Sequence, residues 1–194
     1  EDQAAGIVQP LNPLLSDQKL AALMVAGRVK VLIAYGSDEG AGDSGMWSKA
    51  LRLRSQVPTL TSVLRVAPHD ETVETAPATL LEGVSDFAAL RARQPDDHLV
   101  SQRDIGANDI AAYFHTGGTT GAPKLARHSH GAQVFTAWAS VQLQGLKSTD
   151  TTINGFPLFH VAGVLPGSLA ALSAGVEVII PTTSLYRNKA LIEN

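Results

Sequence analysis

The sequence predicts an α/β protein whose mostly parallel sheet is covered by helices on both faces. Helix-period segments alternate along the chain with short β-branched runs, usually with a glycine between them. The runs at residues 29–34 and 176–180 are almost wholly apolar, which is typical of strands buried on both faces. Ligands of such sheets bind beyond the carboxyl ends of the strands, so the loops that follow strands are the expected location of a site.

Several segments have the spacing of amphipathic helices. Ser16 is placed to cap the first of them and Gly27 to end it. Trp138 belongs to an apolar stripe that we expect to lie in the core. The other helices are expected at residues 46–56, at Ser85–Arg93 with Ser85 as cap and Phe87 and Leu90 inward, along the stripe of Val134, Phe135, Trp138 and Val141 that Gly145 closes, and at residues 165–174, which Gly175 ends.

Five strands and two exposed loops complete the expected pattern. Residues 37–45 are acidic and rich in glycine, and residues 67–78 carry Pro, Asp and Thr without periodicity, so both are predicted loops. The strands are expected at residues 29–34, 62–66, 110–115, 152–158 and 176–180. The strand at 110–115 leads directly into the most informative loop of the chain.

Composition excludes several classes of protein. The 194 residues have a net charge of −3 with both signs scattered, so no basic face predicts a nucleic-acid partner. No apolar run approaches the roughly 20 residues that span a bilayer. The chain contains no cysteine, which excludes disulfides, thiolate metal sites and cysteine nucleophiles. We expect a cytoplasmic protein without a membrane span.

The loop at residues 116–124, TGGTTGAPK, has the chemistry of a phosphate cradle. Its glycines allow backbone shapes in which amide groups turn inward around an anion, and its threonine hydroxyls can donate to phosphate oxygens. Lys124 adds a point charge on a long tether, and Pro123 stiffens the backbone before it. The candidate phosphate-binding residues are Thr116, Gly117, Gly118, Thr119, Thr120, Gly121 and Lys124.

Two common nucleotide motifs do not fit this loop. A P-loop needs G-x-x-x-x-G-K-[ST], but Pro123 precedes Lys124 and Leu125 follows it. The dinucleotide pattern G-x-G-x-x-G is also absent. The alternative is a turn without a ligand, which rarely needs three glycines, three threonines and a lysine together.

The loop resembles the signature of the adenylate-forming superfamily, which includes acyl- and aryl-CoA synthetases, luciferases and peptide-synthetase adenylation domains. Residues 127–130, RHSH, stand where that family commonly has a His after Pro-Lys, and Phe156–His160 with Gly163 resembles its P-L-F-H element. The opening residues 5–13 are similar to its segment before an early helix. The resemblance covers essentially the whole chain, with two departures: Leu125 replaces the usual Gly and Gly117 a frequent Ser.

The resemblance implies a reaction in two halves. A fatty or aryl carboxylic acid attacks the α-phosphorus of ATP to give an acyl-adenylate and pyrophosphate, and coenzyme A then takes the acyl group. The loop would hold the outer phosphates with magnesium, while His160 and Gly163 would lie on the acyl side. The implied cofactors are ATP, Mg and coenzyme A, and the acyl-CoA synthetase branch implies a ligase of fatty acid metabolism.

The resemblance also implies a partial domain. Residues 1–194 correspond to part of the large N-terminal AMP-binding domain, and both ends look truncated. The family's later adenine, magnesium and ribose segments, and its small C-terminal domain with a catalytic lysine, have no counterpart here. We therefore expect an incomplete catalytic set and no adenylating activity from these residues alone. A catalytically degenerate relative and a non-ligase nucleotide-binding α/β module stay open as alternatives.

Other candidate sites are weaker. His128 and His130 lack a third metal ligand, so a helix start near Ser129 is favoured and no metal site is predicted. Residues 42–45, GDSG, imitate a protease nucleophile motif, but the α/β pattern is wrong for that fold. Asp96 and Asp97 are expected to be solvated loop charges.

Overall fold

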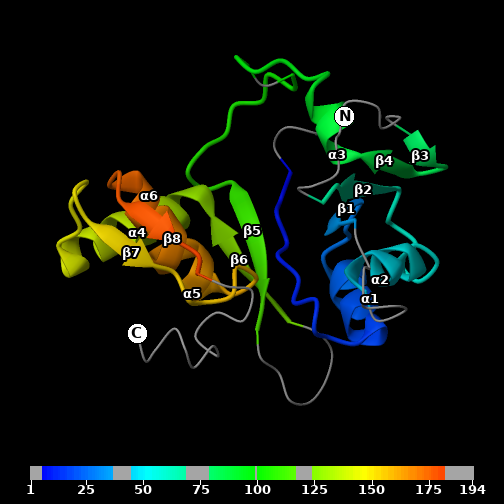
Figure 1. The fold of residues 1–194 in the computed structure, drawn as a ribbon, viewed down its shortest axis with the longest axis horizontal. Helices are drawn as coiled ribbons and strands as arrows, with labels where there is room; N and C mark the ends of the chain where they lie inside the picture. Colours follow the sequence, from blue (N-terminus) through cyan, green and yellow to red (C-terminus); the bar gives the residue numbers. More distant parts are fainter. Residues whose placement is uncertain (1–5, 37–44, 69–78, 99, 117–123, 182–194) are drawn as a thin grey trace. The chain divides into compact units, whose positions relative to one another are not determined.

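The structure, a computed structural model, describes residues 6–36, 45–68, 79–98, 100–116 and 124–181 (Figure 1). The chain divides into two compact units. Unit 1 comprises Glu1–Gly6, Pro13–Arg103 and His115–Leu125, and unit 2 comprises Ile7–Asn12, Asp104–Phe114 and Ala126–Asn194.

Unit 1 is built on a four-stranded sheet in the order β1-β2-β4-β3. The strands are β1 (Val31–Tyr35), β2 (Ser62–Val66), β3 (Thr79–Leu81) and β4 (Val84–Asp86). The pairs β1-β2 and β2-β4 are parallel, and β3 pairs with β4 in the antiparallel sense at the edge. Parallel pairing confirms the predicted α/β class, and β2 has the predicted bounds.

Helices α1 (Asp17–Ala26), α2 (Met46–Leu53) and α3 (Phe87–Arg91) complete unit 1. Helix α2 packs on β1 and β2 around Ala34, Ala50, Val63 and Val84 (Figure 1). The side-chain oxygen of Ser16 accepts a hydrogen bond from the Lys19 N–H at 3.4 Å, as predicted for a helix cap. Gly27 ends α1 as predicted, although the positive φ of 52° falls on Arg28 rather than on the glycine.

An ion pair joins α1 to α2. The Arg52 guanidinium donates to the Asp17 carboxylate at 2.8 Å. This hydrogen bond, together with the positive charges of Arg52 and Lys49, lowers the pKa of Asp17 below its usual value.

Three local predictions in unit 1 are wrong. The predicted strand at residues 29–34 begins two residues later, because the N–H groups of Arg28 and Val29 still donate to the carbonyls of Val25 and Met24 in the turn that closes α1. Helix α2 ends at Leu53, before the predicted residue 56. Ser85 does not cap a helix, since it lies inside β4; the cap of α3 is Asp86, whose carboxylate accepts from the Ala89 N–H at 2.8 Å.

The predicted loops are only partly described. Of the segments 37–45 and 67–78, residues 37–44 and 69–78 lie outside the described residues, and so do Asp43 and Ser44 of the GDSG motif. Asp96 and Asp97 are exposed, as expected. Asp97 contacts the neighbouring ring of His98 at 2.6 Å.

Unit 2 carries two two-stranded sheets, β5-β6 and β7-β8. Strand β5 (Ile110–His115) has the predicted bounds. The Val8 N–H donates to the Ala111 carbonyl, and the Val8 carbonyl accepts from the Tyr113 N–H. Strand β6 (Leu125–Ser129) was not predicted. Strands β7 (Thr151–Ile153) and β8 (Glu177–Ile179) pair in parallel, and β7 is much shorter than the predicted run at residues 152–158.

Helix α4 (His130–Gln144) ends at Gly145, whose left-handed φ of 63° fits its predicted place as the closing residue. A continuous helical stretch follows later, made of α5 (Val161–Val164), the π-helical turn η3 (Leu165–Leu169) and α6 (Ala170–Ser173). Gly175 ends it with a φ of 72°, as predicted. Helix α4 packs against η3 and α6.

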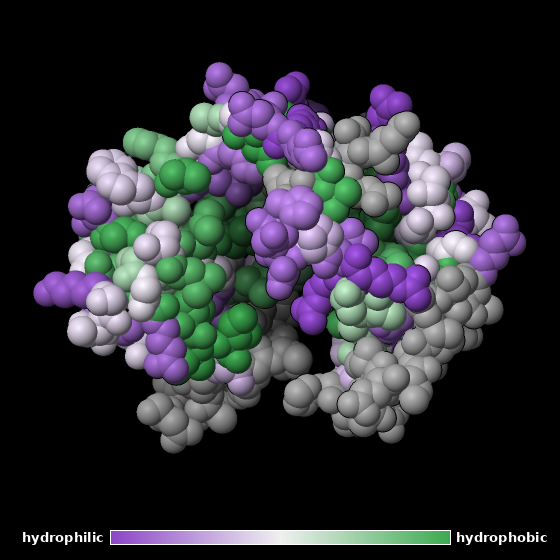
Figure 2. All heavy atoms as spheres, turned by 90° about the horizontal axis from the view of Figure 1, so that it is seen from above, coloured by the Kyte–Doolittle hydropathy of each residue, from purple (hydrophilic) through white to green (hydrophobic). Residues whose placement is uncertain are grey.

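The prediction that Trp138 lies in the core is wrong. Trp138 is 58% exposed, and Val134 and Phe135 are similarly exposed, whereas Ala137 on the other side of α4 is buried. The helix therefore packs on η3 and α6 through the side that carries Ala137. Val134, Phe135 and Trp138 are among the large apolar side chains that remain exposed, and Figure 2 shows hydrophobic residues on the surface in green. No helix in the described part of the chain combines the length and the apolar character of a membrane span.

Candidate functional site

The predicted site residues fall into two groups that belong to different units. Thr116 and Lys124 flank the predicted phosphate loop in unit 1, whereas His160 and Gly163 lie in unit 2. Gly117, Gly118, Thr119, Thr120 and Gly121 lie outside the described residues.

The base of the predicted phosphate loop is closed by Thr116 and Lys124. The Thr116 N–H donates to the Lys124 carbonyl at 3.0 Å, and the Thr116 hydroxyl donates to the same oxygen at 3.4 Å. Strands β5 and β6 are paired neighbours, and a connection this short requires an antiparallel hairpin, since a parallel crossover needs a dozen or more residues. The loop therefore leaves and rejoins one sheet at fixed points.

Both ends of the loop are accessible. Thr116 and Lys124 are exposed, so the lysine ammonium is free to approach an anion in solution. The Thr116 hydroxyl donates its hydrogen to the Lys124 carbonyl. It therefore helps to hold the two ends of the loop together. Strand β6, which the sequence did not predict, stands between the loop and helix α4.

One residue beside the loop was missed by sequence reasoning. His115 ends β5, immediately before Thr116, and its Nδ1 is buried with no hydrogen-bond partner among the described residues. Buried polar atoms without partners are rare in folded proteins. The only sequence feature that could have pointed to His115 was its position directly before the predicted phosphate loop.

The His128 and His130 pair has a structural explanation. The ring of His128 on β6 meets Phe114 edge to face, with centroids 5.0 Å apart and planes at 72°. The Ser129 hydroxyl accepts from the Ala132 N–H at 3.2 Å and caps α4, which confirms the expected helix start. No cluster of possible metal ligands occurs in the described ranges.

Replacing Ser129 by alanine should destabilise unit 2 by about 1 kcal/mol, because the first turn of α4 loses its cap. The matched control is Ser140→Ala, where the lost hydroxyl donates to the Thr136 carbonyl in the middle of the same helix at 2.7 Å. Such mid-helix bonds add little to stability. Urea unfolding should therefore show a lower midpoint for Ser129→Ala only; equal shifts would contradict a capping role.

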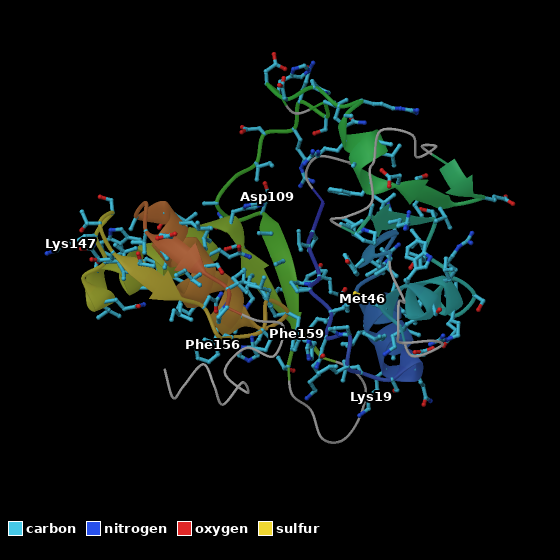
Figure 3. All side chains as sticks on the ribbon, viewed as in Figure 1. Lys19, Met46, Asp109, Lys147, Phe156 and Phe159 are labelled. Carbon is cyan, nitrogen blue, oxygen red and sulfur yellow. The ribbon has the colours of Figure 1, made fainter. Side chains whose placement is uncertain are left out.

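The second group lies in the turn between β7 and α5. Strand β7 ends at Ile153, earlier than the predicted strand at residues 152–158. His160 is the N-cap of α5, and its Nδ1 accepts a hydrogen bond from the Ala162 N–H at 3.1 Å. Phe156 and Leu158 of this turn are about half exposed, at 48% and 50% (Figure 3 labels Phe156 and Phe159). The turn thus presents apolar side chains and one imidazole to the outside.

Gly163 and His160 are brought together. The Gly163 N–H donates to the His160 carbonyl at 3.0 Å, and Gly163 is buried. A Cβ at Gly163 would lie 2.3 Å from the Pro157 carbonyl oxygen. The glycine therefore lets α5 approach the backbone of the turn.

Sequence reasoning also missed Asn154, which follows β7 and is 2% exposed. Its side chain bonds to Gly163, Ser168 and Phe156. An asparagine and a glycine after an apolar run, with Pro157 close behind, were a signal that the strand stops there.

Comparison with known proteins places these features in a family. Residues 3–194 match the AMP-binding enzyme family. The chain belongs to that family, whose signature loop the segment 116–124 was predicted to be.

Several of the relatives that this chain matches are CoA ligases. The marinolic acid–CoA ligase of a Pseudoalteromonas species is 27% identical over 99% of this chain, which covers 28% of that protein. The indoleacetate–CoA ligase of Aromatoleum aromaticum is 34% identical over 51% of this chain and 19% of its own length. The chain thus spans less than a third of these relatives.

Solved structures show the same fold. An anthranilate CoA ligase in complex with anthranoyl-AMP superposes with a TM-score of 0.73 at 22% identity, over 96% of this chain and 32% of that one. ATP-bound MatB from Rhodopseudomonas palustris gives 0.67 at 20% identity, over 97% and 33%. These superpositions agree with the α/β class predicted for this chain.

Proposed function

We propose that these residues form part of an ATP-dependent acyl- or aryl-CoA ligase that makes an acyl-adenylate and then a coenzyme A thioester. The observation that carries the proposal is the TGGTTGAPK segment, closed at its base by Thr116 and Lys124 at the end of β5, in a chain of the AMP-binding family. The relatives named above act on carboxylic acids, which supports a carboxylic acid substrate.

Each described residue has a task in this chemistry. Lys124 places a positive charge beside the outer phosphates of ATP, where negative charge grows as pyrophosphate leaves. The hydrogen bonds from Thr116 to the Lys124 carbonyl fix the backbone position from which the lysine side chain extends. Magnesium would sit with the same phosphates and neutralise part of their charge. His160 and the apolar side chains of its turn would contact the acyl group.

A longer ligase that contains this segment tests the proposal. Incubation with ATP, coenzyme A and a panel of fatty and aryl acids should release AMP and pyrophosphate with at least one acid. Release of ADP and phosphate instead, or no acid-dependent release at all, would overturn it. The acid giving the highest kcat/KM identifies the substrate class.

The 194 residues alone should not catalyse ATP–pyrophosphate exchange with any acid of that panel. Catalysis by this family, as the sequence resemblance implies, needs adenine- and ribose-binding segments that have no counterpart in this sequence. The measurement is isotope exchange between labelled pyrophosphate and ATP, with the longer ligase as positive control. Acid-dependent exchange by this chain would show that its own residues complete the site.

A further inference from the structure

A fully satisfied buried amide lies beneath the His160 turn. Asn154 is 2% exposed, and its Nδ2 donates to the Gly163 carbonyl and to the Ser168 hydroxyl oxygen, both at 2.8 Å. Its Oδ1 accepts from the Phe156 N–H at 3.1 Å. These partners fix the orientation of the amide, because a backbone N–H needs an acceptor and a carbonyl needs a donor. One side chain therefore ties β7, the turn and α5 together.

The surroundings of this amide leave it little freedom to move. A Cβ at Gly167 would lie 2.7 Å from the Asn154 Oδ1, so the π-helical turn touches the amide directly. The Ser168 hydroxyl, in the same turn, donates to the Gly163 carbonyl at 2.9 Å. π-Helical turns occur frequently at functional sites, and a buried polar network with every member satisfied is rigid.

The same turn fixes His160. Its N–H donates to the Pro157 carbonyl at 3.0 Å, and its carbonyl accepts from the N–H groups of Gly163 and Val164 at 3.0 and 3.2 Å. The ring Nδ1 accepts from the Ala162 N–H at 3.1 Å. A nitrogen that accepts a hydrogen bond carries no proton, so the neutral ring must carry its proton on Nε2.

We propose that Asn154 is a positioning residue that holds the Phe156–Gly163 segment and thereby keeps His160 as the Nε2–H tautomer, a hydrogen-bond donor to the substrate carboxylate. The identity of the recipient rests on the proposed function. The tautomer and its dependence on Asn154 do not, because both follow from the hydrogen bonds of this chain. Asn154 acts through the carbonyl of Gly163 and the N–H of Phe156, on either side of His160.

Nitrogen NMR of the labelled chain tests the tautomer without any substrate. At about pH 8.5, well above the usual histidine pKa, the protonated and bare ring nitrogens have distinct shifts. The His160 signals are identified by their loss in His160→Gln. We expect Nε2–H to dominate in the wild type. Asn154→Ala should shift the tautomer ratio toward Nδ1–H by about fivefold, since one ordinary hydrogen bond is lost or loosened.

Hydrogen exchange of single amides separates the two halves of the network. Asn154→Ala should speed exchange of the Phe156 and Ala162 amides by about tenfold, because Phe156 loses its acceptor and the His160 ring that accepts from Ala162 is held less firmly. Asn154→Asp retains an acceptor for the Phe156 amide but no donor for the Gly163 carbonyl. It should therefore protect Phe156 and release Ala162. Unchanged exchange at Ala162 and an unchanged tautomer in a folded Asn154→Ala protein would overturn the proposal.

A milder pair of variants decides the question if Asn154→Ala does not fold. Ser168→Ala removes the hydroxyl that contacts both Asn154 and Gly163. Ser173→Ala removes a hydroxyl on the same helical stretch that donates only to the Ala170 carbonyl, at 2.7 Å. The ratio of the Nε2–H to the Nδ1–H tautomer of His160 should fall by about twofold in Ser168→Ala and stay constant in Ser173→Ala. Equal behaviour of the two would count against the proposal.

The longer ligase provides a separate readout. There Asn154→Ala should raise KM for the carboxylic acid about tenfold and leave KM for ATP unchanged, because His160 is assigned to the acid. A changed tautomer without this effect on KM would leave Asn154 as the positioning residue and contradict the substrate role of His160. The two claims therefore fail separately.

Discussion

Replacing Lys124 by alanine is expected to slow acyl-adenylate formation by about a hundred- to a thousandfold in the proposed ligase, the usual effect of removing one charge-stabilising group from a transition state. Negative charge accumulates on pyrophosphate as it leaves, and the ammonium group of Lys124 offsets it. The side chain starts from a fixed point, since the Lys124 carbonyl accepts from the Thr116 N–H at 3.0 Å. The measurement is the single-turnover rate of pyrophosphate release at saturating ATP.

The matched control is Lys147→Ala, which removes the same charge from an exposed position after α4 in unit 2 (Figure 3). Its rate should stay within about twofold of wild type, because Lys147 lies outside the segment assigned to the phosphates and an exposed charge is screened by salt. Lys124→Arg should retain part of the rate, since it keeps the charge but changes its geometry. A Lys124→Ala enzyme as fast as the control would remove the phosphate role of Lys124 without affecting family membership.

Local chemistry explains what was predictable from the sequence. Ser16 and Ser129 cap their helices because a serine before an apolar helical run has an N–H within reach, whatever the rest of the fold does. Gly145 and Gly175 stand where left-handed backbone ends a helix. The bounds of β2 and β5 follow from short apolar runs with clear breaks on either side.

Tertiary contacts explain what was not predictable. Strands β3 and β4 are three residues each, and their pairing around Gly83 depends on β2 rather than on their own pattern. Whether an apolar residue is buried also depends on what covers it. Trp138 has the spacing of a core residue, but α4 packs on η3 and α6 through its other side, so the indole remains exposed.

The candidate site was predictable as a set of residues but not as a geometry. The sequence predicted a strand at residues 152–158 with His160 close behind it, whereas β7 ends at Ile153 and Asn154 turns the chain away from that strand. An asparagine looks the same in a sequence whether it is solvated or buried with all its hydrogen bonds made. The close approach of Gly163 to the Pro157 carbonyl and of Gly167 to the Asn154 side chain shows that the turn is tightly packed, and the sequence alone does not reveal this packing.

Replacing Gly163 by alanine should therefore destabilise unit 2 by about 3 kcal/mol or more, at the upper end for overpacked sites. The new Cβ would lie 2.3 Å from the Pro157 carbonyl oxygen and 2.9 Å from that of Phe156. Both are backbone atoms, so no side chain can rotate away, and the turn itself must move. Urea unfolding followed by far-UV circular dichroism measures the loss.

Gly145→Ala separates this clash from the general cost of losing a glycine. Gly145 has a left-handed φ of 63°, but no atom lies within 4 Å of the place that an alanine Cβ would take, so its alanine should cost only about 1 kcal/mol of conformational strain. Gly163→Ala should have the lower midpoint of the two. If the two midpoints agree, the contact between α5 and Pro157 relaxes freely, and the turn cannot hold His160 as rigidly as its hydrogen bonds indicate. A lower midpoint means that the close approach at Gly163 and the amide of Asn154 fix the same segment from two sides.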